Sequence, residues 1–158
     1  MRKLLLPLVG LLAFAVGCRT LDALNPFSDP WVESPNYIPI DYDTAWTIIK
    51  SQLFDWEIEV AERDDGEIET RWKVMSQYRL KVEVRLDEVE QDGQQGVRFE
   101  LRVQRQRPKK IWSPVGNQYD EWVNEDPDKL RQDQLLMRFN NKLREAIRLQ
   151  EQARSAGD

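Results

Sequence analysis

Apolar and charged residues alternate between residues 56 and 73, which is the pattern of a β-hairpin with one buried face. The apolar positions are Trp56, Ile58, Val60, Ile68, Thr70 and Trp72. A three-residue loop at 64–66 separates the strands, and its Gly66 supplies the left-handed backbone that such a loop needs. The register that satisfies both faces pairs Ile58 with Trp72, Val60 with Thr70, Glu59 with Arg71 and Glu57 with Lys73.

A second alternation, between residues 78 and 103, predicts a longer hairpin around the two-residue turn Asp92-Gly93. Its apolar face pairs Leu86 with Phe99, Val84 with Leu101 and Val82 with Val103. Its charged face pairs Asp87 with Arg98, Arg85 with Glu100 and Glu83 with Arg102. The two hairpins therefore predict a solvated lattice of charges on one face of the sheet, which argues against a catalytic or ligand site there.

Segments with helical periodicity precede and follow the two hairpins. Residues 43–54 predict a short helix, capped by Asp41 or Asp43, with core positions at Ala45, Trp46, Ile49 and Leu53. Residues 127–152 predict the longest helix, with Asp126 as its cap and Pro127 at its first position. The apolar stripe of this helix consists of Leu130, Leu135, Leu136, Phe139, Leu143, Ala146 and Ile147.

This order of elements predicts a single α+β head domain over residues 41–152, followed by a flexible tail at 153–158. We expect a four-stranded antiparallel sheet of two hairpins. The short N-terminal helix and the long C-terminal helix are expected to pack on one face of that sheet.

The N-terminal residues predict export. Met1-Arg2-Lys3 is a basic start, and residues 4–17 are an apolar stretch too short for a bilayer span of about 20 residues. Residues 1–17 therefore predict a secretory signal peptide. Cys18, the only cysteine of the chain, follows directly.

The sequence Ala15-Val16-Gly17-Cys18 resembles the lipobox of bacterial lipoproteins, although that family usually has leucine at the position of Ala15. The resemblance implies that Cys18 carries three acyl chains and becomes the first mature residue. Arg19 is not an aspartate, so the family's sorting rule implies the outer membrane. The alternative is a signal peptide cut after Ala15, with Cys18 left as a free thiol.

Residues 18–40 contain four prolines and predict a tether rather than a regular element. Aromatic residues, among them Phe27 and Trp31, are interspersed in it. One hypothesis is a stiff spacer whose last aromatics pack on the head. The other is a binding strand that docks on a partner through residues such as Phe27 and Trp31.

Residues 104–126 predict an irregular loop that combines charge with aromatic residues. Its basic positions, followed by a tryptophan, are Arg105, Arg107, Lys109, Lys110 and Trp112. Near a surface of anionic lipid head groups, each such charge contributes about 1 kcal/mol. The alternative is a strand end followed by aromatic side chains that close the edge of the core.

Composition excludes several classes of function. The chain has no histidine and one cysteine, which excludes His/Cys metal sites and Ser-His or Cys-His catalysis. Its net charge of −5 makes nucleic acid a poor partner. Its seven glycines are scattered and form no phosphate-binding loop. We expect no cofactor, no metal and no small-molecule substrate; chemistry with two carboxylates alone stays open.

The order of elements resembles the helix-grip domains of BamC-type lipoproteins, which belong to the outer-membrane β-barrel assembly machine. The local likeness covers residues 56–60, Trp-Glu-Ile-Glu-Val, and residues 65–72, Asp-Gly-Glu-Ile-Glu-Thr-Arg-Trp. This chain has one such domain where that family has two, and its tether is shorter. The shape is also similar to the lipopolysaccharide-assembly lipoproteins of the LptE type.

Two functions follow as hypotheses. The first is a non-enzymatic lipoprotein, anchored in the outer membrane and facing the periplasm, that acts as an accessory or scaffolding subunit of an envelope protein complex. The second is a lipid- or glycolipid-binding module that uses the basic and aromatic residues of the loop at 105–123. A hydrolase with carboxylates alone is a third, weaker hypothesis.

Overall fold

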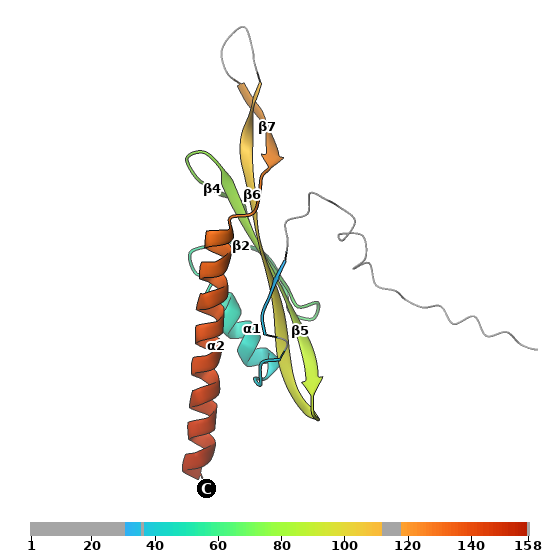
Figure 1. The fold of residues 1–158 in the computed structure, drawn as a ribbon, viewed down its shortest axis with the longest axis vertical. Helices are drawn as coiled ribbons and strands as arrows, with labels where there is room; N and C mark the ends of the chain where they lie inside the picture. Colours follow the sequence, from blue (N-terminus) through green and yellow to red (C-terminus); the bar gives the residue numbers. More distant parts are fainter. Residues whose placement is uncertain (1–30, 36, 112–117, 158) are drawn as a thin grey trace, which may run out of the picture.

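The computed structural model describes residues 31–35, 37–111 and 118–157, and within these residues the chain has an α+β fold. A seven-stranded antiparallel sheet packs against the short helix α1 (Tyr42–Ser51) and the long helix α2 (Lys129–Gly157). Both helices lie on the same side of the sheet, and α2 runs along its length (Figure 1). This arrangement confirms the predicted α+β fold, in which a short N-terminal and a long C-terminal helix pack against an antiparallel sheet.

The sheet has more strands than the four that the sequence predicted. The strands are β1 (Val32–Glu33), β2 (Ile58–Glu62), β3 (Glu67–Thr70), β4 (Lys73–Val74), β5 (Arg79–Gln91), β6 (Gln94–Ile111) and β7 (Gln118–Asn124). The main order is β1-β6-β5-β3-β2, while β4 pairs with β5 and β7 pairs with β6. β4 and β7 extend the central hairpin at the end away from its turn, and β1 pairs with the middle of β6.

The central hairpin, β5–β6, has the predicted register. Leu86 pairs with Phe99 and Glu83 with Arg102, and all six predicted pairs are present. Asp92 and Gly93 form the turn with φ values of 52° and 76°. Two left-handed residues in a two-residue loop match the right-handed twist of the strands, which is why this turn fixes the register.

The predicted register of the first hairpin is wrong. Ile58 pairs with Thr70 rather than with Trp72, and the register shifts between Ile58 and Val60 at a β-bulge. On the turn side of the bulge, Val60 already pairs with Glu69 rather than with Thr70, because the loop holds residues 63–66 instead of 64–66. Glu57 therefore forms its ion pair with Arg71 instead of Lys73, and Lys73 contacts the Asp55 carboxylate at 3.7 Å. A local alternation of residues reveals neither the extra loop residue nor the bulge.

Residues 31–40 belong to the head rather than to a separate tether. β1 pairs with β6, and Ile38 forms a bridge with Val97. Ser34 donates its N–H to the carbonyl oxygen of Phe99, and the hydroxyl of Ser34 accepts from the N–H of Phe99. Ile38 and Ile40 are buried in the core, so the predicted domain boundary at residue 41 lies too late in the chain.

The helices begin at polar caps that differ in part from the predicted ones. The carboxylate of Asp41 accepts from the N–H of Thr44 at 2.8 Å, which confirms one of the two predicted caps of α1. In α2, the Asp128 carboxylate accepts from the N–H of Arg131 at 3.0 Å, two residues after the predicted cap. The helix continues to Gly157, past the predicted end at 152.

The core lies between the helices and the inner face of β3, β5 and β6. Phe99 and Phe139 meet edge to face across it, with ring centroids 5.7 Å apart. Leu130 was predicted to join this core but is 70% exposed, because it lies in the first turn of α2, off the stripe that faces the sheet. The buried apolar residues include Ala45, Trp46, Ile49, Leu53, Leu80, Val82, Val84, Leu101, Val103, Leu135 and Leu143.

Residues 104–126 are not the irregular loop that the sequence predicted. β6 continues to Ile111, and β7 pairs with it from Gln106–Asn124 to Ile111–Gln118. The two strands project past the start of α2 as a two-stranded arm (Figure 1). The basic residues of the predicted loop therefore lie on a strand.

Candidate functional site

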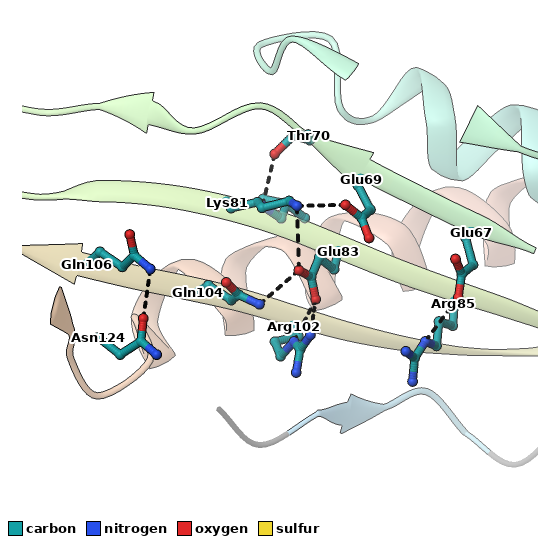
Figure 2. Close-up of polar contacts among 11 residues, drawn as sticks. Glu67, Glu69, Thr70, Lys81, Glu83, Arg85, Arg102, Gln104, Gln106 and Asn124 are labelled. Atoms are coloured by element: carbon teal, nitrogen blue, oxygen red, sulfur yellow. Dashed lines mark hydrogen bonds and ion pairs between the residues drawn. The ribbon is translucent and has the colours of Figure 1, made fainter. Parts of the chain in front are cut away.

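The face of the sheet opposite the helices carries the predicted lattice of charges (Figure 2), but the centre of this lattice is shielded from solvent rather than solvated as predicted. The side chains of Glu83, Arg102 and Lys81 are only 9%, 12% and 16% exposed. Glu83 accepts from Nε of Arg102 at 2.7 Å and from the amide of Gln104 at 2.8 Å. Lys81 donates to Glu69 at 2.6 Å and lies 3.9 Å from Glu83. Both oxygens of Glu83 are thus engaged, and the group joins three strands rather than serving as an acid or a base.

Trp31 covers one end of this charge network. The guanidinium groups of Arg85 and Arg102 lie 4.4 Å and 4.5 Å from the centroid of its ring. Each such cation–π contact contributes about 0.5–2 kcal/mol, depending on exposure. Trp31 therefore packs on the head itself, which agrees with the hypothesis of a spacer whose last aromatic residues pack on the head.

Arg79 occupies the other end of the same face, between two indole rings. Its guanidinium lies 4.5 Å from the ring centroids of both Trp72 and Trp122, and it donates twice to the side-chain oxygen of Gln106. Burial lowers the pKa of Arg79 below its ordinary value, which still leaves it charged at neutral pH. The stack ties β4 and β7 to the central hairpin.

The basic residues that were candidate lipid contacts face acids of β7 and of the turn after it. Arg105 and Arg107 lie 3.0 Å and 2.8 Å from the carboxylate oxygens of Glu125, and Lys109 lies 2.9 Å from Glu121. Lys110 is exposed and has no ion pair within the described residues. Three of the four predicted basic contacts are thus engaged in ion pairs within the head, two of them with the same carboxylate. Cys18, Phe27 and Trp112 lie outside the described residues.

Among the grooves on the described part of the head, two differ clearly in polarity. The first, which we name the α1–β2 groove, has a volume of about 520 Å³ and is lined by Trp46, Thr47, Lys50, Ser51, Leu53, Phe54, Trp56 and Ile58. Its lining is largely apolar, and Phe54 beside it is 78% exposed. An apolar groove that opens to solvent at an exposed phenylalanine can receive an apolar side chain.

The second groove is polar, with a volume of about 620 Å³, and two of the three carboxylates that line it are already engaged, while the third is that of the exposed Glu88. Asp43 forms an ion pair with Arg63, and Asp41 caps α1. Hydrogen bonds from Thr44 lower the pKa of Asp41 below its ordinary value, so the group stays ionised at neutral pH. Among residues 31–35, 37–111 and 118–157, no cluster of acids has the geometry of a metal site. The groove thus offers no pair of free carboxylates.

Sequence reasoning singled out Trp31 and the basic residues but missed the α1–β2 groove. Trp46, Leu53 and Trp56 were assigned to the core, and they are indeed buried, but together they also form the floor of the groove. The available signal was Phe54, an aromatic residue at a helix end, off the apolar stripe of α1.

Comparison with known proteins gives no relative: neither a family model nor a curated protein matches this chain. Neither helix in the described residues is long and apolar enough to cross a bilayer.

Proposed function

We infer that this protein is a lipid-anchored, non-enzymatic lipoprotein of the outer membrane, facing the periplasm. It serves as an accessory or scaffolding subunit of a cell-envelope protein complex. The lipobox at residues 15–18 supports the anchor. The likeness to BamC-type helix-grip domains makes outer-membrane protein assembly the first pathway to examine.

The observation that carries this proposal is the attachment of residues 31–40 to the sheet. β1 pairs with β6, and Trp31 packs on Arg102 of the same strand. Only residues 19–30 therefore separate the head from Cys18. Twelve extended residues reach about 40 Å at about 3.3 Å per residue. A head on so short a connection works close to the membrane surface, where envelope complexes assemble.

The contacts of the basic residues favour a protein partner over a lipid surface. Glu125 pairs with both Arg105 and Arg107, Glu121 pairs with Lys109, and the protein as a whole is acidic. Anionic head groups would have to compete with these ion pairs. The apolar α1–β2 groove, by contrast, offers a surface of the kind that proteins recognise.

A fractionation experiment with a matched control tests the anchor. Cys18→Ala should move the protein from the membrane fraction to the soluble periplasmic fraction, whereas Thr20→Ala should leave it in the membrane. Retention of Cys18→Ala in membranes washed with carbonate would refute the lipid anchor.

A pull-down tests the partner. The tagged, lipidated protein is recovered in mild detergent from its native envelope, and co-purifying proteins and lipids are identified by mass spectrometry. Stoichiometric recovery of envelope assembly components supports the proposal. Recovery of glycolipid with no stoichiometric protein would contradict it and favour the lipid-binding function.

A further inference from the structure

One edge of the sheet is closed and the other is open. The outer edge of β6 pairs with β1 and, further along, with β7. Between these two strands, the side-chain oxygen of Gln132 from α2 accepts from the N–H of Val103 at 3.3 Å. At the opposite end of the strand order stands β2, and no described strand pairs with its outer edge. An unpaired edge presents a row of backbone donors and acceptors to an incoming strand.

The α1–β2 groove lies directly beside this open edge. Ile58, the first residue of β2, lines the groove, and Trp56 continues its wall just before the strand begins. The opposite wall comes from α1 and includes Trp46 and Thr47. A strand added to β2 would alternate its side chains between this groove and the opposite face, since strand side chains have a period of two. Backbone pairing and an apolar pocket are thus offered together, as in domains that bind peptides by strand addition.

The charges at this edge determine which strand fits. β2 carries Glu59 and Glu62 and no basic residue, both glutamates are exposed, and neither has an ion pair within the described residues. Two acids of the adjoining loop, Asp64 and Asp65, extend the negative charge past the end of the strand. A strand that carries lysine or arginine therefore complements the edge.

The same charges disfavour two other occupants. A second copy of this chain would bring its own β2 glutamates against these, and like charges across a strand pair are destabilising. Residues 20–30 contain Asp22 and Asp29 and no basic residue, so the chain's own N-terminal segment lacks the complementary charge.

We propose that β2 and the α1–β2 groove form a docking site for an extended, basic peptide segment of a partner protein. The segment pairs with the outer edge of β2 and places one apolar side chain in the groove beside Phe54. This proposal rests on the proposed function, because it specifies the kind of segment that the envelope partner presents.

The test uses the lipidated protein in detergent and a capped eight-residue peptide that alternates lysine with valine around one central phenylalanine. Binding is measured by calorimetry and mapped by hydrogen exchange, which should show protection at 58–62. Two control peptides have glutamate in place of lysine, or proline at two central valine positions, since proline cannot donate to a ladder. Both controls should bind at least about ten-fold more weakly, a difference of about 1.4 kcal/mol.

Three variants test the site on the protein. Thr47→Arg introduces bulk and positive charge at an exposed position in the groove, and Glu59→Lys reverses the charge of the edge. Each should weaken binding about ten-fold, or by about 1.4 kcal/mol. Glu151→Lys is the control for Glu59→Lys, because it makes the same change in net charge at an exposed position of α2. It should leave the affinity within about two-fold, less than 0.5 kcal/mol.

Several results would overturn the proposal. Absence of saturable binding would do so, as would equal binding of the proline peptide, which would indicate attraction by charge alone. A dimer that dissociates in Phe54→Ala would make a second copy the occupant. Binding that appears only after deletion of residues 20–30 would assign the groove to the chain's own segment. In each case the fractionation of Cys18→Ala still reports on the anchor independently.

Discussion

At the scale of single residues, buried charge and helix capping make separable contributions to this fold. Glu83 is held by Arg102, Gln104 and Lys81 on a face of the sheet that no helix covers. Asp41 lies at an exposed helix end, where its carboxylate replaces a backbone partner for Thr44. Glu83 therefore contributes to the stability of the whole sheet, whereas Asp41 contributes to the stability of α1.

Removing the charge of Glu83 should destabilise the head by about 3 kcal/mol, because Arg102 would remain shielded without its charged partner, whereas Lys81 keeps Glu69. Urea unfolding of Glu83→Gln measures this loss. The double variant Glu83→Leu with Arg102→Leu should recover much of it, since an apolar pair needs no compensating charge. A double variant less stable than Glu83→Gln would contradict this account.

The cap of α1 predicts a dependence of stability on pH. Asp41→Ala should cost about 1 kcal/mol at neutral pH, whereas Asp41→Asn should be nearly neutral because asparagine caps equally well. Thr44 lowers the pKa of Asp41 in the folded state, so this stabilisation is present above the ordinary value of 3.8 and is lost as pH falls through the folded pKa. Unfolding of wild type and Asp41→Asn from pH 7 to pH 2 should show that the variant lacks this loss; identical profiles would remove Asp41 as its source.

At the scale of elements, the register of the hairpin β5–β6 followed directly from the sequence, whereas the register of β2–β3 and the pairing of strands far apart in the chain did not. The turn Asp92-Gly93 fixed β5 against β6, and all six predicted pairs are present. β1 pairs with residues more than sixty positions away, and the prolines that flank it and its mixed polarity are typical of a spacer. The α1–β2 groove was missed for the same reason, since it depends on how a helix and a strand lie in space.

Gly96 is the point where the N-terminal segment comes closest to the central hairpin. A Cβ at this position would collide with the ring of Tyr37 and the carbonyl oxygen of Ile38. Gly96→Ala should therefore loosen the N-terminal segment and destabilise the head by more than Gly93→Ala. The latter substitution meets no atom within 4 Å and costs only about 1–2 kcal/mol of left-handed strain.

Hydrogen exchange checks this prediction at the amides of Ile38 and Val97, which bond to each other's carbonyl groups at 2.9 Å. Faster exchange of both amides in Gly96→Ala, but not in Gly93→Ala, is the expected result. Equal protection in the two variants would show that the segment adapts without separating from β6.

At the scale of the whole molecule, the structure predicts where the stable head begins. A chain of residues 31–158 should fold cooperatively, whereas residues 41–158 should be several kcal/mol less stable. The shorter chain lacks Ile38 and Ile40, and loss of one large buried side chain typically costs about 2–5 kcal/mol.

Thermal unfolding with light scattering distinguishes the two chains. The shorter one also exposes the edge of β6 at residues 97–101, so we expect it to associate at lower concentration. Equal melting temperatures of the two chains, with no association of the shorter one, would show that residues 31–40 act only as a spacer.

The attachment of Ser34 to Phe99 also bears on the time course of biogenesis. These residues are 65 positions apart, and contacts of such separation form late because the intervening chain must first be ordered. The segment of the head that is synthesised first is thus the last to pair with the sheet. If Cys18 is acylated as proposed, completion of the sheet then shortens the connection between the head and the membrane.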